Sequence, residues 1–163
     1  MDSVSKLNLA CGNEYADGHW NVDDCSMYPS IKVDQRDDIT KMSWKLDSLD
    51  VIRLSHFAMY LRPEAMSRLL VRWKSWLKNG GKIEIETIDV KKVANIVATS
   101  NDIEEINTWG LTNLFGNPVT CPHEWGWSPR TLTVALHQAG FSDVKVGKGT
   151  KKPGRDFLIT AIK

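Results

Sequence analysis

The segment that most limits the fold of this chain is LNLACGNEYADGHWNVDD, residues 7–24. It starts like a buried strand, reaches Gly12, and has an acid, Asp23, eleven residues later at the end of a second strand-like segment. A complete strand–helix–strand unit places such an acid about twenty residues after the glycine. A crossover between parallel strands normally needs about a dozen residues or more. The segment therefore predicts two neighbouring strands joined by an unusually short connection.

Strand-like and helix-like patterns alternate along the rest of the chain, which predicts an α/β fold with a doubly wound, mostly parallel sheet. The last two strands are separated by the turn GKGTKKPGRD, so we expect the chain to end in an antiparallel hairpin. The expected strands are residues 7–10, 20–22, 31–34, 51–55, 82–87, 144–146 and 157–162.

The best-defined helix lies in RPEAMSRLLVRWKSWLKNGG, where Pro63 suits the first turn and residues 79–81, Asn-Gly-Gly, suit the end. Its apolar residues recur at helical spacing and predict a buried stripe. They are Ala65, Met66, Leu69, Leu70, Trp73, Trp76 and Leu77.

Further helices are expected on either side of a long loop at residues 110–128. Asp89 is a suitable N-cap for a helix that runs to residue 99, and residues 101–109 add a short acidic helix. In SPRTLTVALHQAG, Ser128 is a suitable cap and Gly140 a suitable stop.

Composition restricts the class of protein. The 163 residues suit one domain, 1–163, and 42% hydrophobic with 25% charged residues is usual for a soluble globular chain. A net charge of +1 argues against non-specific binding to nucleic acid or acidic membranes. Three cysteines without CxxC spacing argue against a disulfide framework. Since we find neither a signal-peptide pattern nor an apolar run of bilayer length, we expect a cytoplasmic protein without a membrane partner.

A ligand of an open parallel sheet binds beyond the carboxyl ends of the strands. At that edge, Gly12 permits a sharp turn and a close approach of a ligand to the backbone. Asp23 can accept both hydroxyls of a ribose, with Asp24 as the alternative. A single glycine instead of GxGxxG disfavours a dinucleotide. Composition alone also allows a core strand followed by a tight loop with solvated acids.

Several motifs in order resemble one branch of the class I S-adenosylmethionine-dependent methyltransferases. LNLACGN and DGHWNVDD resemble its LNLGCGN motif and its x-G-[FW]-x-N-V-D segment, between which the first crossover helix is reduced. VDQRDDIT resembles the third motif, and VIRLSHFAMYL the fourth strand with its loop. LKNGGKIEIETID and HEWGWSPRTLTVALHQAGFSDV resemble the L-K-P-G-G region and the late helix that ends in A-G-F. The resemblance covers about residues 6–162.

This resemblance implies S-adenosylmethionine as the cofactor and assigns residues to it. The backbone of Ala10, Cys11 and Gly12 would line the methionine part, and Asp23 would hold the ribose hydroxyls. The remaining assignments are Asp38 with Ile39 behind it at the adenine, and Ser55 with His56 beneath the sulfonium.

The chain departs from that branch in two places. Ala10 stands where the family has its first glycine, so the turn must accept a Cβ there. Met59 and Tyr60 replace a Glu-His pair, so any help that this pair gives to catalysis in the family is missing.

Methyl transfer to a hydroxyl or amine calls for a base, and histidine is the usual choice. His123, beside Glu124, Trp125 and Trp127 on the expected loop, is the first catalytic candidate, and His56 is the second. Cys121 and His123 lack a partner pair for zinc, so we expect no metal.

The sequence thus predicts methyl transfer to a small acceptor such as a saccharide, a nucleotide-sugar or a metabolite. One alternative is another reaction in the same pocket, such as cleavage of the sulfonium or aminopropyl transfer. A second is a non-enzymatic S-adenosylmethionine-binding module, with a homodimer to supply walls that the short chain lacks. A third is a nucleic-acid methyltransferase, which the near-neutral charge disfavours.

Overall fold

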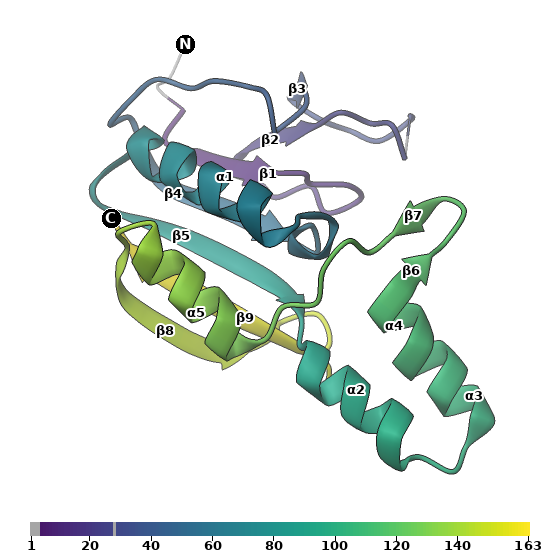
Figure 1. Cartoon of the computed structure of the whole chain (residues 1–163). Coiled ribbons are helices and arrows are strands. Elements are labelled where there is room, and N and C mark those ends of the chain that lie inside the picture. The colour runs from purple at the N-terminus through teal and green to yellow at the C-terminus, as the bar shows by residue number, and fades with distance from the viewer. Residues whose placement is uncertain (1–3, 28) are drawn as a thin grey trace.

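A seven-stranded sheet with the order β3-β2-β1-β4-β5-β9-β8 forms the centre of the molecule (Figure 1). The structure is a computed structural model that describes residues 4–27 and 29–163. Neighbours from β3 to β5 run parallel, whereas β9 runs antiparallel to both β5 and β8. This confirms the predicted α/β sheet of mostly parallel strands with an antiparallel terminal hairpin. The strands are β1 (Lys6–Leu9), β2 (Trp20–Asp23), β3 (Gln35–Arg36), β4 (Leu49–Ser55), β5 (Leu77–Ile88), β8 (Ser142–Lys148) and β9 (Asp156–Ile162).

Two helices, α1 (Pro63–Trp76) and α5 (Pro129–Gln138), lie side by side on one face of the sheet (Figure 1). The predicted apolar stripe of α1 faces the core, where Trp73, Met66 and Leu70 have no exposed surface. Ser128 caps α5 by accepting a hydrogen bond from the Thr131 backbone N–H, as part of a capping box. The predicted cap and helical periodicity are therefore confirmed on this face.

The opposite face of the sheet is more polar, as the register of the strands shows. One row across β1, β4, β5 and β9 contains Asn8, Arg53, Glu84 and Thr160, whereas the adjacent row contains Leu9, Leu54, Ile85 and Ile159. The apolar row is buried, while Arg53, Glu84 and Thr160 are partly exposed. Within the described residues, the three connections before β4 contain no helix. The helices therefore cover the apolar rows, and the polar rows face away from them.

Residues 89–128 form a lobe that projects beyond the end of β5 (Figure 1). Asp89 caps its first helix, as predicted, by accepting a hydrogen bond from the Lys91 backbone N–H. The expected loop at residues 110–128 is wrong in part, because its first residues continue a helical segment and a small hairpin follows. The elements of the lobe are α2 (Val90–Thr99), α3 (Ile103–Glu105), the π-helix η2 (Ile106–Leu111), α4 (Thr112–Phe115), β6 (Gly116–Asn117) and β7 (Cys121–Pro122).

Two other expected boundaries are wrong. The third strand occupies Gln35–Arg36 instead of residues 31–34. There, the Asp34 carboxylate accepts a hydrogen bond from the Asn21 backbone N–H, which takes the place of a ladder bond. Residues 79–81 do not end a helix: α1 stops at Trp76 and β5 starts at once, passing through a bulge opposite β4.

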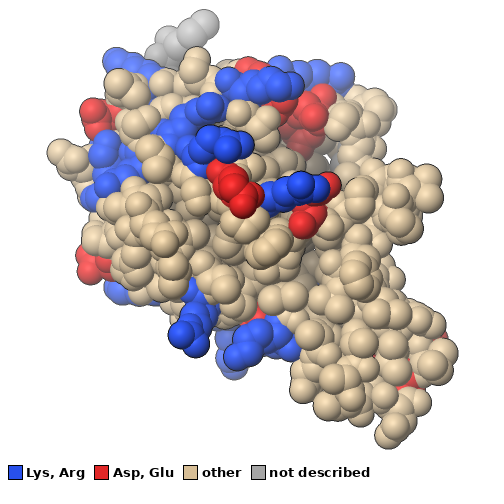
Figure 2. Space-filling view, in the orientation of Figure 1, with Lys and Arg blue, Asp and Glu red and all other residues tan. Residues whose placement is uncertain are grey.

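Charged and uncharged surfaces separate on the face that carries α1 and α5. Figure 2 shows lysines, arginines and acids around the sheet half of the molecule, while the lobe is almost entirely uncharged in this view. Large exposed apolar side chains of the lobe are Ile103, Trp109, Phe115, Val119 and Trp125. No helix in the described part of the chain combines the length and the apolar character that a membrane crossing requires.

Candidate active site

A cavity of about 540 Å³ opens at the carboxyl ends of the parallel strands. All eight residues assigned to the cofactor from the sequence line it: Ala10, Cys11, Gly12, Asp23, Asp38, Ile39, Ser55 and His56. The lobe contributes Thr120, Cys121 and Pro122 to the wall, so part of the segment expected as a loop, residues 110–128, reaches the site. The volume suits one nucleoside-sized ligand with space beside it.

The short connection after β1 is closed by Asp23. Its Oδ2 accepts a hydrogen bond from the Gly12 backbone N–H at 2.9 Å, and its Oδ1 accepts one from Cys25 N at 2.7 Å. Gly12 has a φ of +49°, which a residue without a Cβ adopts readily. The acid at the end of β2 therefore binds the turn after β1 directly, and this contact needs no intervening helix.

Asn21 on β2 holds the rest of that connection. Its Oδ1 accepts hydrogen bonds from Asn8 Nδ2 at 2.9 Å and from Ala16 N at 2.8 Å. Its Nδ2 donates to Asp34 Oδ2 at 2.9 Å. Asn8 and Asn21 are fully buried, and a buried, hydrogen-bonded amide pair fixes a loop in one conformation. These side chains therefore fix the loop where a crossover helix would otherwise pack.

Backbone strain gathers at this cavity. Among the described residues, five that are not glycine have positive φ, and two of them, Ala10 (φ +50°) and His56 (φ +52°), line the cavity. A third, Cys25 (φ +59°), donates its backbone N–H to Asp23. Such conformations persist where the surrounding contacts impose them, and they are frequent at functional sites. Ala10 thus has a left-handed backbone at the position where the motif that this segment resembles has glycine.

Asp38 lines the cavity but uses its carboxylate for local contacts. Its Oδ1 accepts hydrogen bonds from the Thr40 backbone N–H at 2.9 Å and hydroxyl at 2.6 Å, and its Oδ2 pairs with Lys41 at 2.8 Å. The hydrogen bond from Lys41, followed by those from Thr40, lowers the pKa of Asp38 to about 2. The neighbouring Asp37 also lines the cavity and is a second acid near the place expected for an adenine.

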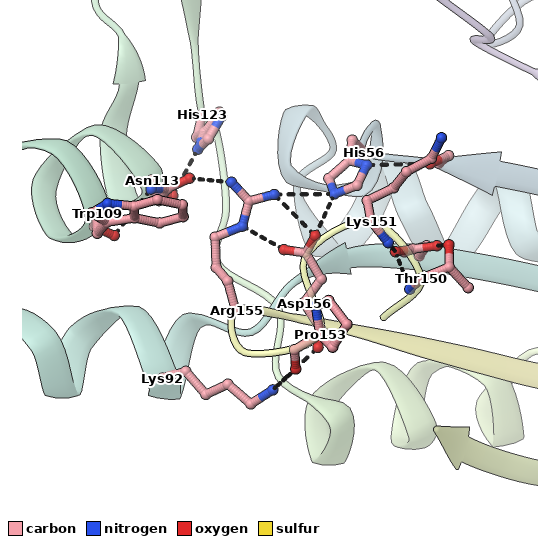
Figure 3. Close-up of polar contacts among 12 residues, drawn as sticks. His56, Lys92, Trp109, Asn113, His123, Thr150, Lys151, Pro153, Arg155 and Asp156 are labelled. Atoms are coloured by element: carbon pink, nitrogen blue, oxygen red, sulfur yellow. Dashed lines mark hydrogen bonds and ion pairs between the residues drawn. The ribbon is translucent and has the colours of Figure 1, made fainter. Parts of the chain in front are cut away.

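His56 is part of a buried polar network (Figure 3). Its Nε2 lies 2.9 Å from Asp156 Oδ2, and its Nδ1 lies 3.2 Å from Ser55 Oγ. Arg155 donates to both oxygens of Asp156, at 2.5 Å and 3.0 Å, and to Asn113 Oδ1 of the lobe at 2.8 Å. The network therefore connects the end of β4, the start of β9 and the lobe at one edge of the cavity.

Glu86 on β5 lies beside this network. Its Oε1 accepts hydrogen bonds from the backbone N–H groups of Thr150 and Lys151, at 2.7 Å and 2.8 Å, and its Oε2 accepts one from the Thr150 hydroxyl. Lys151 also pairs with Glu14 on the cavity wall. The β8–β9 turn is thus bound to the sheet and, through Lys151, to the first loop.

One oxygen or nitrogen from each of His56, Glu86 and Asp156 lies within 4.8 Å of the others, a spacing that could hold a metal ion. However, both Glu86 oxygens accept hydrogen bonds from the β8–β9 turn, and the Arg155 guanidinium bonds both oxygens of Asp156. A guanidinium in that position supplies the positive charge that a cation would bring. We therefore interpret the group as an ion-pair network.

The cavity lining is strongly acidic. Five carboxylates line it, and none of the described lining residues is lysine or arginine. They are Glu14, Asp23, Asp24, Asp37 and Asp38. Glu14 and Asp38 pair with Lys151 and Lys41, which lie outside the lining. The acids still outnumber these two cations, so the wall disfavours polyphosphates and favours ligands that carry positive charge. Burial, and then the neighbouring Asp23, raises the pKa of the Cys11 thiol to about 11, so this thiol stays protonated in the cavity wall.

His123, the first catalytic candidate, lies beside the cavity and is not among the residues that line it. Its ring packs edge-on against Tyr60 with 5.4 Å between centroids, and its Nδ1 lies 3.1 Å from the Asn113 carbonyl (Figure 3). Burial lowers its pKa below the usual value. Trp127 does not form a wall of the site, because it is buried in the core and its Nε1 donates to the Ala58 carbonyl.

Sequence reasoning missed several residues of the site. Arg155, Asp156 and Glu86 are buried or nearly buried around His56, yet they are about 30 to 100 positions away along the chain. No spacing rule connects such positions. The one available signal was that charged residues stand at the ends of strands on the ligand-binding edge of the sheet.

Comparisons with known proteins agree on the fold. A scan against protein-family models finds no match, and a search of curated proteins also finds none. Among solved structures, a SAM-dependent methyltransferase from Archaeoglobus fulgidus superposes with a TM-score of 0.69 at 20% identity, covering 99% of this chain and 87% of that one. One from Mesorhizobium loti gives 0.65 at 16%, covering 99% and 91%. Human N-acetylserotonin methyltransferase in complex with SAM gives 0.62 at 16%, covering 97% and 47%. The chain therefore has the fold of these methyltransferases.

Proposed function

We propose that this protein transfers a methyl group from S-adenosylmethionine to a hydroxyl or amine of a small acceptor. The observation that carries the proposal is the acidic cavity at the strand ends, in which Asp23 closes on Gly12. Nucleotides such as ATP or NAD would bring phosphates against five carboxylates. S-adenosylmethionine has the same nucleoside, but its sulfonium and ammonium groups outweigh its one carboxylate, so its net positive charge matches this lining.

The lining residues fit the parts of this cofactor. Asp23 offers carboxylate oxygens to the ribose hydroxyls, next to the Gly12 backbone. Ile39 provides an apolar surface for the adenine, with Asp38 or Asp37 for its amino group. The turn at residues 10–12 would face the methionine part.

When bound, the cofactor supplies an activated methyl group whose leaving group is a neutral sulfide. The protein then has to align the acceptor, exclude water and remove the proton of the acceptor. His56 lines the cavity and is the base that we propose; His123 is the alternative from the lobe, and its lowered pKa keeps it neutral at physiological pH. The face of the lobe seen in Figure 2, which is almost entirely uncharged, and the acidic lining favour a small acceptor over nucleic acid.

The chain is proposed to act as one domain in the cytoplasm. One seven-stranded sheet runs through the molecule, and β6 and β7 add a small hairpin in the lobe. Cys11, Cys25 and Cys121 are free thiols, which suits a reducing compartment.

Calorimetric titration with S-adenosylhomocysteine tests the cofactor assignment, with ATP as the control ligand. We expect micromolar affinity for the former and none measurable for ATP. Tighter binding of ATP would contradict the charge argument.

A second experiment separates enzyme from binding module. The protein is incubated with methyl-labelled S-adenosylmethionine and a deproteinised metabolite extract, and label in new small molecules is measured. Binding without transfer would favour a non-enzymatic module, release of label without an extract would favour cofactor cleavage, and label in added RNA would favour a nucleic-acid methyltransferase.

A further inference from the structure

In the buried network around His56, the Asp156 carboxylate has no exposed surface and is contacted from two sides. Arg155 donates to both of its oxygens, and His56 Nε2 lies 2.9 Å from its Oδ2. An ionised carboxylate is an acceptor only, so the 2.9 Å contact is a hydrogen bond only when Nε2 carries a proton. Arg155 Nη2 lies 3.3 Å from Nε2 and can only donate, so it would instead bond an unprotonated Nε2. The shorter contact favours the proton on Nε2, with Arg155 Nη2 donating to Asp156 Oδ2 at 3.0 Å.

This arrangement fixes the other end of the imidazole. In the neutral ring only one nitrogen is protonated, so a proton on Nε2 leaves Nδ1 with a free lone pair. Ser55 Oγ lies 3.2 Å from Nδ1 and therefore donates its hydroxyl hydrogen to it. The oxygen of Ser55 then has lone pairs that can accept a further hydrogen bond. Ser55 and His56 both line the cavity.

We propose that Ser55, His56 and Asp156 form a proton-accepting chain for the methyl acceptor, in which Asp156 is the positioning residue. This inference rests on the proposed function and narrows it, because the acceptor must then bring a hydroxyl or N–H proton to Ser55. A carboxylate or thioether acceptor has no such proton and would not need the chain.

The transfer balances as follows. The acceptor O–H or N–H proton moves to Ser55 Oγ while the Ser55 proton moves to His56 Nδ1, which becomes an imidazolium. The lone pair left on the acceptor forms the new bond to the methyl carbon. The carbon–sulfur bond breaks, and its electron pair stays on the sulfur, which leaves as a neutral sulfide. Asp156 stabilises the imidazolium through Nε2.

The surroundings of His56 support this role. Asp156 and Arg155 face its ring from the start of β9, and Glu86 faces it from β5. Burial acts to raise the pKa of Asp156, but the hydrogen bonds from His56 and Arg155 outweigh it, so the pKa lies below the usual value. Asp156 therefore remains ionised at physiological pH. The φ of +52° at His56 shows that the site holds this residue in a backbone conformation that it would otherwise disfavour.

The first test reads the tautomer directly and needs no acceptor. In protein labelled with ¹⁵N-histidine, long-range ¹H–¹⁵N correlations show which ring nitrogen of His56 carries the proton. We expect Nε2–H in the wild type. In Asp156→Asn, Arg155 keeps the amide oxygen, so the amide NH₂ faces His56 and the proton should move to Nδ1. A wild-type ring protonated on Nδ1 would overturn the proposal.

The second test measures turnover with methyl-labelled S-adenosylmethionine and a deproteinised metabolite extract. Asp156→Asn should lower turnover by about 10²–10⁴-fold, with the Kd of S-adenosylhomocysteine unchanged within about threefold. Ser55→Ala should lower turnover at least tenfold. Ser128→Ala removes the α5 cap away from the network and controls for lost stability.

The outcomes separate the two proposals. Equal turnover in Asp156→Asn and wild type, or parallel losses of turnover, affinity and melting temperature, would show that Asp156 is only structural and would overturn the inference. No S-adenosylhomocysteine binding by the wild type would overturn the proposed function, whichever tautomer His56 has.

Discussion

Asp23→Asn should weaken the binding of S-adenosylhomocysteine about a hundredfold. A hydrogen bond to a charged acceptor contributes about 1.5–3 kcal/mol, and Asp23 is placed to accept two from a ribose. Asparagine keeps one neutral oxygen, so we expect the binding free energy to weaken by about 2.7 kcal/mol, which corresponds to a Kd about a hundredfold higher. Asp24→Asn is the matched control, because Asp24 also lines the cavity but uses its Oδ1 for Ser26.

Stability must be measured alongside affinity, because the carboxylate of Asp23 also binds two backbone N–H groups, of Gly12 and Cys25. In the variant, the amide NH₂ faces one of these donors, which costs about 1–3 kcal/mol in the free energy of unfolding. Calorimetry is therefore run where both proteins are fully folded by circular dichroism. Loss of affinity in Asp24→Asn alone would show that Asp24, and not Asp23, binds the ribose. Unchanged affinity in both variants would refute a nucleoside site at this edge of the sheet.

Three further predictions concern stability and are checked by urea unfolding. Trp127→Phe leaves the Ala58 carbonyl without its 2.9 Å indole donor in the core and should lower the free energy of unfolding by about 1–3 kcal/mol; an unchanged midpoint would be inconsistent with that bond. Ala10→Gly relieves a left-handed φ of +50° and should raise stability by up to about 1 kcal/mol, whereas a loss would mean that its Cβ packs favourably. Because the pKa values of Asp38 and Asp156 are lowered in the folded protein, their contribution is complete above the unfolded value near 3.9 and is lost as pH falls towards the folded values. The midpoint should therefore drop between about pH 5 and pH 3, and a flat profile there would contradict these shifts.

The sequence by itself determined most local structure. Pro63 starts α1, Asp89 caps α2 and Ser128 caps α5, because each signal acts within one helical turn. The short spacing in sequence between Gly12 and Asp23 also indicated a cavity wall. An acid at the end of β2 can reach the turn after β1 only if the two strands are neighbours.

Only the tertiary structure decided which distant groups meet. Residues 79–81 could end a helix or enter a strand, and the pairing of Leu77 with Leu49 on β4 selected the strand. His56 and Asp156 are 100 positions apart and meet because β9 inserts antiparallel beside β5. His123 has a reactive side chain and lies in the sequence beside an acid and tryptophans, yet its packing against Tyr60 placed it outside the cavity wall. The physical reason is that local signals fix the conformation of a few residues, whereas the order and register of strands bring side chains together.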